Sequence, residues 1–202
     1  MKKILLVMLC VLTATTVLVG CGKGGEKVSE EKSNVVEVNG KEITLPCTLA
    51  ELENCGVFIA RKSAKQEIVN SENQDFSLIE MTSNSFEEDE ILKAMISTGE
   101  DHKKKEENCI VTRIINETVA SDKFAVGGKI GLGSTIKETT NAFGKKNYEL
   151  LTEEDDEEKG LSQVHYFGED GNSGKFFYFQ NNECVYVEVF GNIEKPVVDI
   201  VD

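Results

Sequence analysis

The sequence predicts an α+β fold: two tandem helix-then-antiparallel-sheet units, related by an internal duplication, after a cleaved signal peptide and a flexible tether. Helix-capping motifs open both halves of the chain, and strand-like runs of β-branched and aromatic residues follow them. The closing strands of the two halves also align. The predicted segments are residues 1–20 (signal peptide), 21–34 (lipidated Cys21 and tether), 35–118 (first unit), 119–194 (second unit) and 195–202 (C-terminal tail).

The first 21 residues have the layout of a lipoprotein signal peptide. Lys2 and Lys3 give a positive start, residues 4–17 are mostly apolar, and the Leu-Val-Gly-Cys of residues 18–21 has the pattern of a lipobox. A thiol can carry a diacylglycerol as a thioether, so Cys21 is the predicted lipid-attachment residue. The apolar run is shorter than the roughly 20 residues of a membrane span. We expect a protein anchored by lipid to the extracytoplasmic face of the cell membrane; the alternative is an ordinary secretory signal with an incidental cysteine.

The net charge indicates which partners to expect. The chain carries a formal charge of -14 at pH 7, and loss of the two signal-peptide lysines brings the mature chain to -16. Phosphate backbones and anionic lipid headgroups repel such a surface. Nucleic acid is therefore excluded as a partner. The expected partners are the membrane, through the anchor, and a protein or peptide; the acidity itself serves solubility or, alternatively, a specific cationic ligand.

Four cysteines remain in the mature chain after Cys21, and an extracytoplasmic site permits disulfides. Cys47 and Cys55 bracket a predicted helix that would hold them about 10 Å apart, against the roughly 4.4 to 6.8 Å of a disulfide. Cys109 with Cys184 is the pair to test first; four reduced, partly buried thiols are the alternative. The cysteine and histidine spacings predict no metal site and no cofactor.

The first half begins with a predicted hairpin over residues 35–45. Asn39-Gly40 accepts the positive φ angles of a type I′ turn between its strands. Pro46 ends the hairpin, and Thr48 with Glu51 forms a capping box for a short helix that reaches Cys55.

The rest of the first half reads strand, helix, strand. Residues 76–82 predict a strand. Ser85 with Glu88 forms a second capping box, and it opens a predicted helix with one apolar face made by Ile91, Leu92, Met95 and Ile96. Residues 97–107 are polar and loop-like, and residues 109–115 predict a β-branched strand.

The second half follows the same plan. A glycine-rich turning segment leads to a third capping box at Thr135 and Glu138, whose helix ends at Phe143-Gly144. Strands are predicted at residues 163–167, 175–179 and 184–190. Alignment of the closing strands places Cys109 on Cys184, Ile110 on Val185, Thr112 on Val187 and Ile114 on Val189, which suggests the duplication. The alternative is a chance match of two amphipathic strands.

One segment carries a family resemblance. Gly133-Ser134-Thr135, Glu138 and Phe143-Gly144-Lys145 lead from a short helix into a strand meander. This pattern resembles the helix-on-sheet modules of β-lactamase-inhibitor-like proteins and of small outer-membrane assembly lipoproteins, although Thr139 stands where those helices prefer an apolar residue. The whole chain resembles uncharacterised lipobox-type lipoproteins of Gram-positive bacteria. The resemblance implies a binding or scaffold module and no active-site residue.

The sequence shows no catalytic constellation. His102 and His165 have no nucleophile motif beside them, and residues 131–134 (Gly-Leu-Gly-Ser) lack the lysine of a phosphate loop, so a helix cap explains them better. The acidic run at residues 153–158 and the pair Asp170 and Asn172 read as solvated loops, with weak Ca²⁺ binding as the alternative. We therefore predict that the protein is not an enzyme.

The predicted function is that of a non-catalytic, membrane-anchored binding or envelope-interaction lipoprotein. The alternative is the substrate-binding lipoprotein of a transporter, and a surface hydrolase comes third. The candidate partner face is aromatic: Tyr186 and Phe190 on one side of the last strand, together with Phe177 and Phe179. The competing interpretation is that this face lies in the core.

Overall fold

A computed structural model of the chain describes residues 35–60, 77–97, 109–144, 148–151, 161–168 and 173–191. These residues form a mainly β protein, with twelve strands and two short helices among them. The prediction of an α+β fold made of two helix-then-sheet units is therefore wrong. The predicted signal peptide, tether and C-terminal tail lie outside the described residues.

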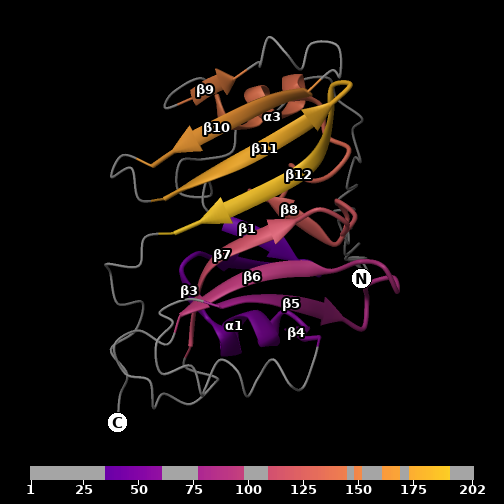
Figure 1. Cartoon of the computed structure of the whole chain (residues 1–202), viewed down its shortest axis with the longest axis vertical. Helices are drawn as coiled ribbons and strands as arrows, with labels where there is room; N and C mark the ends of the chain where they lie inside the picture. The colour runs from indigo at the N-terminus through magenta and orange to yellow at the C-terminus, as the bar shows by residue number, and fades with distance from the viewer. Residues whose placement is uncertain are drawn as a thin grey trace, which may run out of the picture.

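A large sheet contains strands from both halves of the chain (Figure 1). Its nine strands follow the order β4-β5-β6-β7-β12-β11-β10-β9, with β3 paired to β7, and every pair is antiparallel. The pairing of β7 with β12 joins residues 35–118 and 119–194 in one sheet instead of two. The strands are β3 (Cys47–Thr48), β4 (Val57–Ile59), β5 (Ser77–Ser83), β6 (Leu92–Ser97), β7 (Ile110–Asn116), β9 (Tyr148–Leu151), β10 (Leu161–Phe167), β11 (Gly174–Gln180) and β12 (Glu183–Phe190).

A small sheet lies behind the middle of the large one in Figure 1, and its strand order is β2-β1-β8. It consists of β1 (Val35–Val38), β2 (Lys41–Thr44) and β8 (Phe124–Val126). Asn39 and Gly40 have φ angles of 52° and 74°, so the predicted hairpin turn is confirmed. β8 comes from the second half of the chain, which ties the halves together a second time.

Both helices begin where the capping boxes predict. Helix α1 (Leu49–Asn54) follows Thr48, and helix α3 (Ile136–Phe143) follows Thr135. In α3 the Thr135 backbone N–H donates to Glu138 Oε2 at 2.8 Å, while the Glu138 N–H donates to Thr135 Oγ1 at 3.2 Å. These reciprocal bonds satisfy backbone donors that have no partner within the helix.

The helix predicted from Ser85 to Ile96 is wrong, because this segment is a turn followed by strand β6. Leu92, Ala94 and Ile96 are all buried, so the segment uses a period of two residues. The spacing of the apolar residues fits both the helical period and the two-residue period of a strand. Pairing with β5 and β7 selects the strand. Ser85 caps no helix; its hydroxyl donates to Asn39 Oδ1 at 2.5 Å.

The core lies between the large sheet and the layer formed by the small sheet and the helices. One row of paired residues crosses the inner side of the large sheet, and each member is at most 1% exposed: Met81, Leu92, Asn116, Val187 and Phe177. Val36, Val38, Phe124 and Val126 from the small sheet belong to the same buried cluster. The two sheets therefore share one hydrophobic core.

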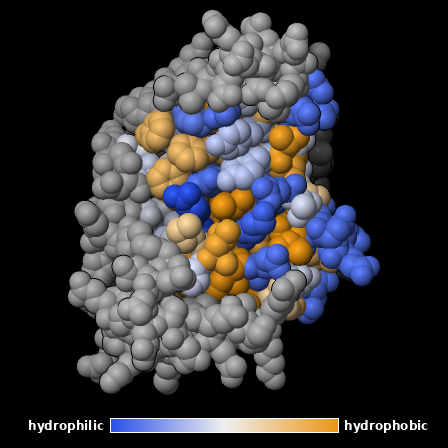
Figure 2. Space-filling model, in the orientation of Figure 1, coloured by the Kyte–Doolittle hydropathy of each residue, from blue (hydrophilic) through white to orange (hydrophobic). Residues whose placement is uncertain are grey.

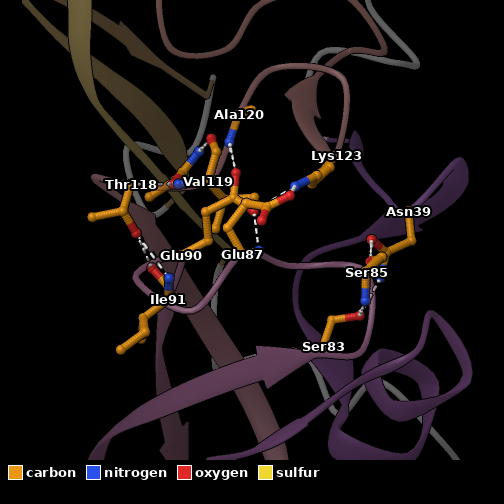
Figure 3. Close-up of polar contacts among 11 residues, drawn as sticks. Asn39, Ser83, Ser85, Glu87, Glu90, Ile91, Thr118, Val119, Ala120 and Lys123 are labelled. Carbon is orange, nitrogen blue, oxygen red and sulfur yellow. Dashed lines mark hydrogen bonds and ion pairs between the residues drawn. The ribbon is translucent and has the colours of Figure 1, made fainter.

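A buried carboxylate joins the loop before β6 to the segment before β8 (Figure 3). Glu90 is 6% exposed, and its Oε2 accepts hydrogen bonds from Lys123 Nζ at 2.6 Å and from the Glu87 N–H at 2.7 Å. Its Oε1 accepts from the Ala120 N–H at 3.0 Å. All three donors are protein groups, so this cluster of charged residues is a structural joint.

Replacing Glu90 by glutamine is expected to lower the free energy of unfolding at pH 7 by about 1–3 kcal/mol, because charge-assisted bonds to a buried group are lost. Burial raises the pKa of Glu90, but its hydrogen bonds to Lys123, Ala120 and Glu87 outweigh that effect and bring the pKa below the ordinary value. A carboxyl whose folded pKa is depressed stabilises the fold above its unfolded pKa, and this contribution is lost as the pH falls through the folded pKa. The difference in free energy of unfolding between wild type and the variant should therefore be smaller at acidic pH. Urea unfolding of both proteins at pH 7 and at pH 3 measures this difference.

Glu87→Gln is the matched control, since it makes the same charge change on a side chain that is 78% exposed. Surface carboxylates contribute little to stability. Equal losses in the two variants would contradict a structural role for Glu90.

Candidate functional site

The candidate site lies on the open face of the large sheet, the side turned away from the core. Directly paired residues point to the same side, so the register identifies the side chains of this face. One row runs His165, Phe176, Glu188, Ile115 and Lys93, and the neighbouring rows contain Tyr178 with Tyr186 and Arg113 with Phe190. Figure 2 shows ring-shaped side chains gathered on the side of the molecule that faces the viewer.

Six rings from three adjacent strands form a contiguous group on this face. The shortest ring-centroid distances are 4.4 Å between His165 and Phe176, 4.7 Å between Tyr178 and Tyr186, and 5.2 Å between Phe176 and Phe190. Such separations are those of favourable aromatic pairs. The aromatic cluster, as we name it, consists of His165, Phe167, Phe176, Tyr178, Tyr186 and Phe190.

An ion pair between a buried carboxylate and a partly exposed arginine contacts the cluster. Glu188 is 5% exposed; its Oε1 lies 2.5 Å from Arg113 Nη1, and its Oε2 accepts from the Tyr186 hydroxyl at 2.5 Å. The Arg113 guanidinium also lies 5.4 Å from the centroid of the Phe190 ring, a cation–π contact. One carboxylate thus fixes the positions of an arginine on the adjacent strand and of a tyrosine on its own strand.

Burial and nearby carboxylates raise the pKa of both tyrosines of the cluster. Burial raises the pKa of Tyr186, and the hydrogen bond to Glu188 and the charges of Glu188 and Glu117 raise it further. Burial and the charge of Glu188 raise the pKa of Tyr178 as well. Both phenols therefore stay neutral at physiological pH and act as hydrogen-bonding groups, not as bases.

The structure divides the predicted partner face between two sides of the sheet. Tyr186 and Phe190 lie in the aromatic cluster, but Phe177 and Phe179 are 0% exposed and lie in the core, so their placement on this face is wrong. A β-bulge explains the error. Gln180 pairs with Glu183, and if the pairing continued without a bulge, Phe177 would lie opposite Tyr186. The bulge at Val185 shifts the register by one residue, so Tyr178 lies opposite Tyr186.

Four members of the cluster were not predicted: His165, Phe167, Phe176 and Tyr178. Residues 176–179 are all aromatic, so alternation alone does not indicate which pair faces outward. The pairing of β11 with β12 predicts the outward-facing pair only if the hairpin has no bulge. For such a regular hairpin it selects the wrong two of these four residues.

The predicted disulfide between Cys109 and Cys184 is wrong. None of the four cysteines in the described part of the chain forms a disulfide, and all four are buried. β7 and β12 run antiparallel, so Cys109 and Cys184 lie beyond opposite ends of their pairing, on the order of 30 Å apart along the strands. Burial raises the pKa of Cys184 to about 12, so the residue is a thiol at neutral pH. The alternative of four reduced, buried thiols is what the structure shows.

The other predicted features give no competing site. Cys21, His102, the acidic run at residues 153–158, Asp170 and Asn172 lie outside the described residues. Residues 131–134 lead into the cap of α3, as their interpretation as a helix cap requires. Within the described ranges no group of three or more His, Cys, Asp or Glu side chains could hold a metal ion.

An unpredicted buried amine lies on the inner side of β11. Lys175 is 3% exposed, and its Nζ lies 4.6 Å from the centroid of the Phe143 ring of α3. Burial lowers its pKa to about 7. Because Lys175 faces the core, it takes no part in the open face.

Two further observations bear on the class of protein. Neither helix in the described part of the chain is long and apolar enough to cross a membrane. Comparison of the chain with models of protein families, with curated proteins and with solved structures found no match.

Proposed function

We propose that this protein is a lipid-anchored, non-catalytic binding protein of the extracytoplasmic membrane face, which docks a polypeptide partner on its aromatic cluster. The observation that carries the proposal is the cluster itself: six adjacent rings on the open face, with Tyr186 and Arg113 held by the buried Glu188. Tyrosine, phenylalanine and arginine are the side chains enriched where proteins bind proteins. Rings that are fixed before binding also lose little entropy when a partner docks.

The anchor part of the proposal rests on residues 18–21. The tether of residues 22–34 would let the folded body stand a mean distance of about 20 Å from the lipid. The transporter alternative expects two α/β lobes with parallel strands, whereas all the strand pairs in the described residues are antiparallel. The fold therefore favours the binding module.

Replacing Cys21 by alanine is expected to release the protein from membranes or to block its maturation. Acyl chains contribute about 0.8 kcal/mol per buried CH₂ group, and two or three chains hold far more firmly than one. Detergent phase partitioning, with wild type alongside, measures the effect. A correctly cleaved variant that still enters the detergent phase would contradict the lipobox assignment.

The double substitution Tyr186→Ser with Phe190→Ser is expected to abolish co-purification of the partner from membranes while the fold remains intact. Both side chains are half-buried on the open face, so the loss of stability should be far smaller than for a core ring. Thermal unfolding and pull-down from membranes are measured on the same preparation.

Leu78→Ser is the matched control for this test. Leu78 is 57% exposed and lies on the same face, two strands from Arg113 and outside the cluster. It should leave the partner bound. A partner that stays bound to the folded double variant would rule out docking at the cluster.

A further inference from the structure

We propose that residues 192–202, the segment that follows β12, dock on the aromatic cluster of their own molecule and compete there with the polypeptide partner. This inference rests on the proposed function and adds the regulation of that site. It is carried by three features: the direction in which the chain leaves β12, the apolar composition of the segment, and the exposed rings within its reach. The segment itself lies outside the described residues.

The neighbouring strands limit where the chain can go after β12. β12 and β3 pair with the same side of β7, since β6 pairs along its other side. The Gly191 N–H donates to Thr112 O at 2.9 Å, and β3 pairs with the two residues of β7 that come next, Val111 and Ile110. β3 therefore blocks any continuation of β12 along β7, and the chain has to leave the sheet at Gly191.

The segment that connects β2 to β3 sets the direction of departure. Phe190 lies on the open face, so a Cβ at Gly191 would point to the inner side of the sheet. That side is occupied by backbone, because the Cβ would lie 2.5 Å from Leu45 C and from Pro46 N. Leu45 belongs to the shared hydrophobic core. With the inner side closed and β3 ahead, the way out of Gly191 is toward the open face, beside Phe190.

The segment that departs there has the composition of a strand. Its apolar residues are all β-branched and make up half of residues 193–202: Ile193, Val197, Val198, Ile200 and Val201. The predicted tether of residues 22–34 contains one apolar residue, Val28. Burying β-branched side chains against aromatic rings is favourable, because both surfaces leave water. The segment after β12 therefore suits the cluster, whereas the tether does not.

The cluster lies within reach of this segment. An extended chain covers about 3.3 Å per residue, so the seven residues from Gly191 to Val198 span up to about 23 Å. Adjacent strands are about 4.8 Å apart, which puts β10, the farthest strand of the cluster, about 10 Å from β12. Phe167 on β10 is 37% exposed, and its ring centroid lies 5.8 Å from that of Phe176. Val198 and Ile200 can therefore reach rings on all three strands.

Covalent attachment makes even a weak contact effective. A segment joined to its site by a few residues acts at an effective concentration on the order of 1 mM. If the separate segment binds with a dissociation constant of about 0.1 mM, the attached one is docked about nine-tenths of the time, and the apparent affinity of the partner falls about tenfold. The partner thus has to displace the chain's own segment before it can dock.

A single tryptophan reports whether the segment is docked. The chain has no tryptophan, so Val198→Trp adds one fluorophore that can be excited selectively. Acrylamide quenching is measured on the full-length lipidated protein in a non-ionic detergent, and on a synthetic peptide of residues 192–202 with the same substitution. We expect a quenching constant several times smaller in the protein than in the peptide. Equal quenching constants would overturn the inference.

Ring substitutions locate the docked segment. Tyr186→Ser with Phe190→Ser should raise the quenching constant of the tryptophan to that of the peptide. Phe58→Ser is the matched control, because it removes a 38% exposed ring of β4 outside the cluster, and it should leave quenching unchanged. Shielding by the detergent would persist in all variants. A tryptophan that stays shielded in the folded double variant, or that Phe58→Ser exposes equally, would mean that the segment docks elsewhere and would overturn the inference.

Competition with the partner is measured on the chain without tryptophan. Val198→Ser with Ile200→Ser should raise the amount of partner recovered from membranes by up to about tenfold when the partner is limiting. Unchanged recovery would overturn the competition. The comparison of protein with peptide stands even if a ring variant fails to fold.

The two proposals fail separately. A tryptophan quenched as readily as the peptide, together with loss of the partner from Tyr186→Ser with Phe190→Ser, would leave the cluster as a partner site that the segment does not cover. A tryptophan that this double variant releases, while the partner stays bound to it, would place the segment on the cluster and the partner elsewhere.

Discussion

Phe177→Ala is expected to lower the free energy of unfolding by about 3–5 kcal/mol, the largest loss that we predict for a single residue. The ring is 0% exposed, and it lies in the inner row between Val164 and Val187. It stacks on Phe143 of helix α3 with a centroid distance of 5.7 Å. Truncation removes this packing and leaves a cavity between the sheet and the helix, which the surrounding backbone is too constrained to fill. Urea denaturation measures the change.

Phe176→Ala is the matched control, since it makes the same substitution one residue earlier on the same strand. Its ring is half-buried in the aromatic cluster, so we expect a loss of about 1 kcal/mol from the aromatic contacts. The ratio of the two losses tests which side of β11 faces the core. A larger loss for Phe176 than for Phe177 would mean that the bulge in β12 is absent and that Phe177 and Phe179 belong to the open face.

Gly191→Ala is expected to cost about 3 kcal/mol, at the upper end of the range for overpacking. Gly191 follows β12, and its N–H donates to Thr112 O at 2.9 Å. A Cβ atom there would lie 2.5 Å from Leu45 C and from Pro46 N, and 2.6 Å from Leu45 O. All three are backbone atoms, so no side chain can rotate to make room. The end of β12 would have to separate from the segment that connects β2 to β3.

Gly133→Ala provides the comparison. Gly133 has a φ angle of 82°, and no atom lies within 4 Å of the point that an alanine Cβ would occupy, so the substitution costs only the conformational strain of about 1 kcal/mol. Thermal unfolding of both variants separates steric exclusion from backbone strain. Similar destabilisation of the two would show that Gly191 is not in close contact with residues 45–46.

The elements that sequence predicts correctly are those encoded by neighbouring residues. The turn at Asn39-Gly40 needs positive φ angles, and the boxes at Thr48 and Thr135 need only a partner three residues away. Strands β5, β7, β10, β11 and β12 also follow from alternation and composition, with shifts of one or two residues at their ends.

The elements that sequence misses depend on partners far along the chain. Residues 91–96 satisfy both a helical and a strand period, and pairing on both sides decides for the strand. β8 is three residues long and is a strand because β1, almost ninety residues earlier, pairs with it. The joining of β7 to β12 has no local signal at all, which is why sequence patterns favour two separate sheets.

The candidate site shows the same limit at the scale of one residue. The last strand's alternation correctly groups Tyr186, Glu188 and Phe190 on one face. The β11 side chains that lie beside these residues depend on the register between β11 and β12, and the bulge at Val185 changes that register by one residue. A one-residue shift reverses every side chain of a strand relative to its partner, so Phe176 and Tyr178 take the place predicted for Phe177 and Phe179.

The junction between β7 and β12 also determines how this protein can be divided. Only four residue pairs form it, from Arg113–Phe190 to Asn116–Val187, yet it lies in the middle of the large sheet. A fragment that ends after β7, or one that begins after it, would carry a central strand as a bare edge, with unpaired N–H and C=O groups beside apolar side chains. Such edges recruit other strands and lead to aggregation. Soluble production of either half alone should fail, whereas co-expression of the two halves supplies each edge with its natural partner.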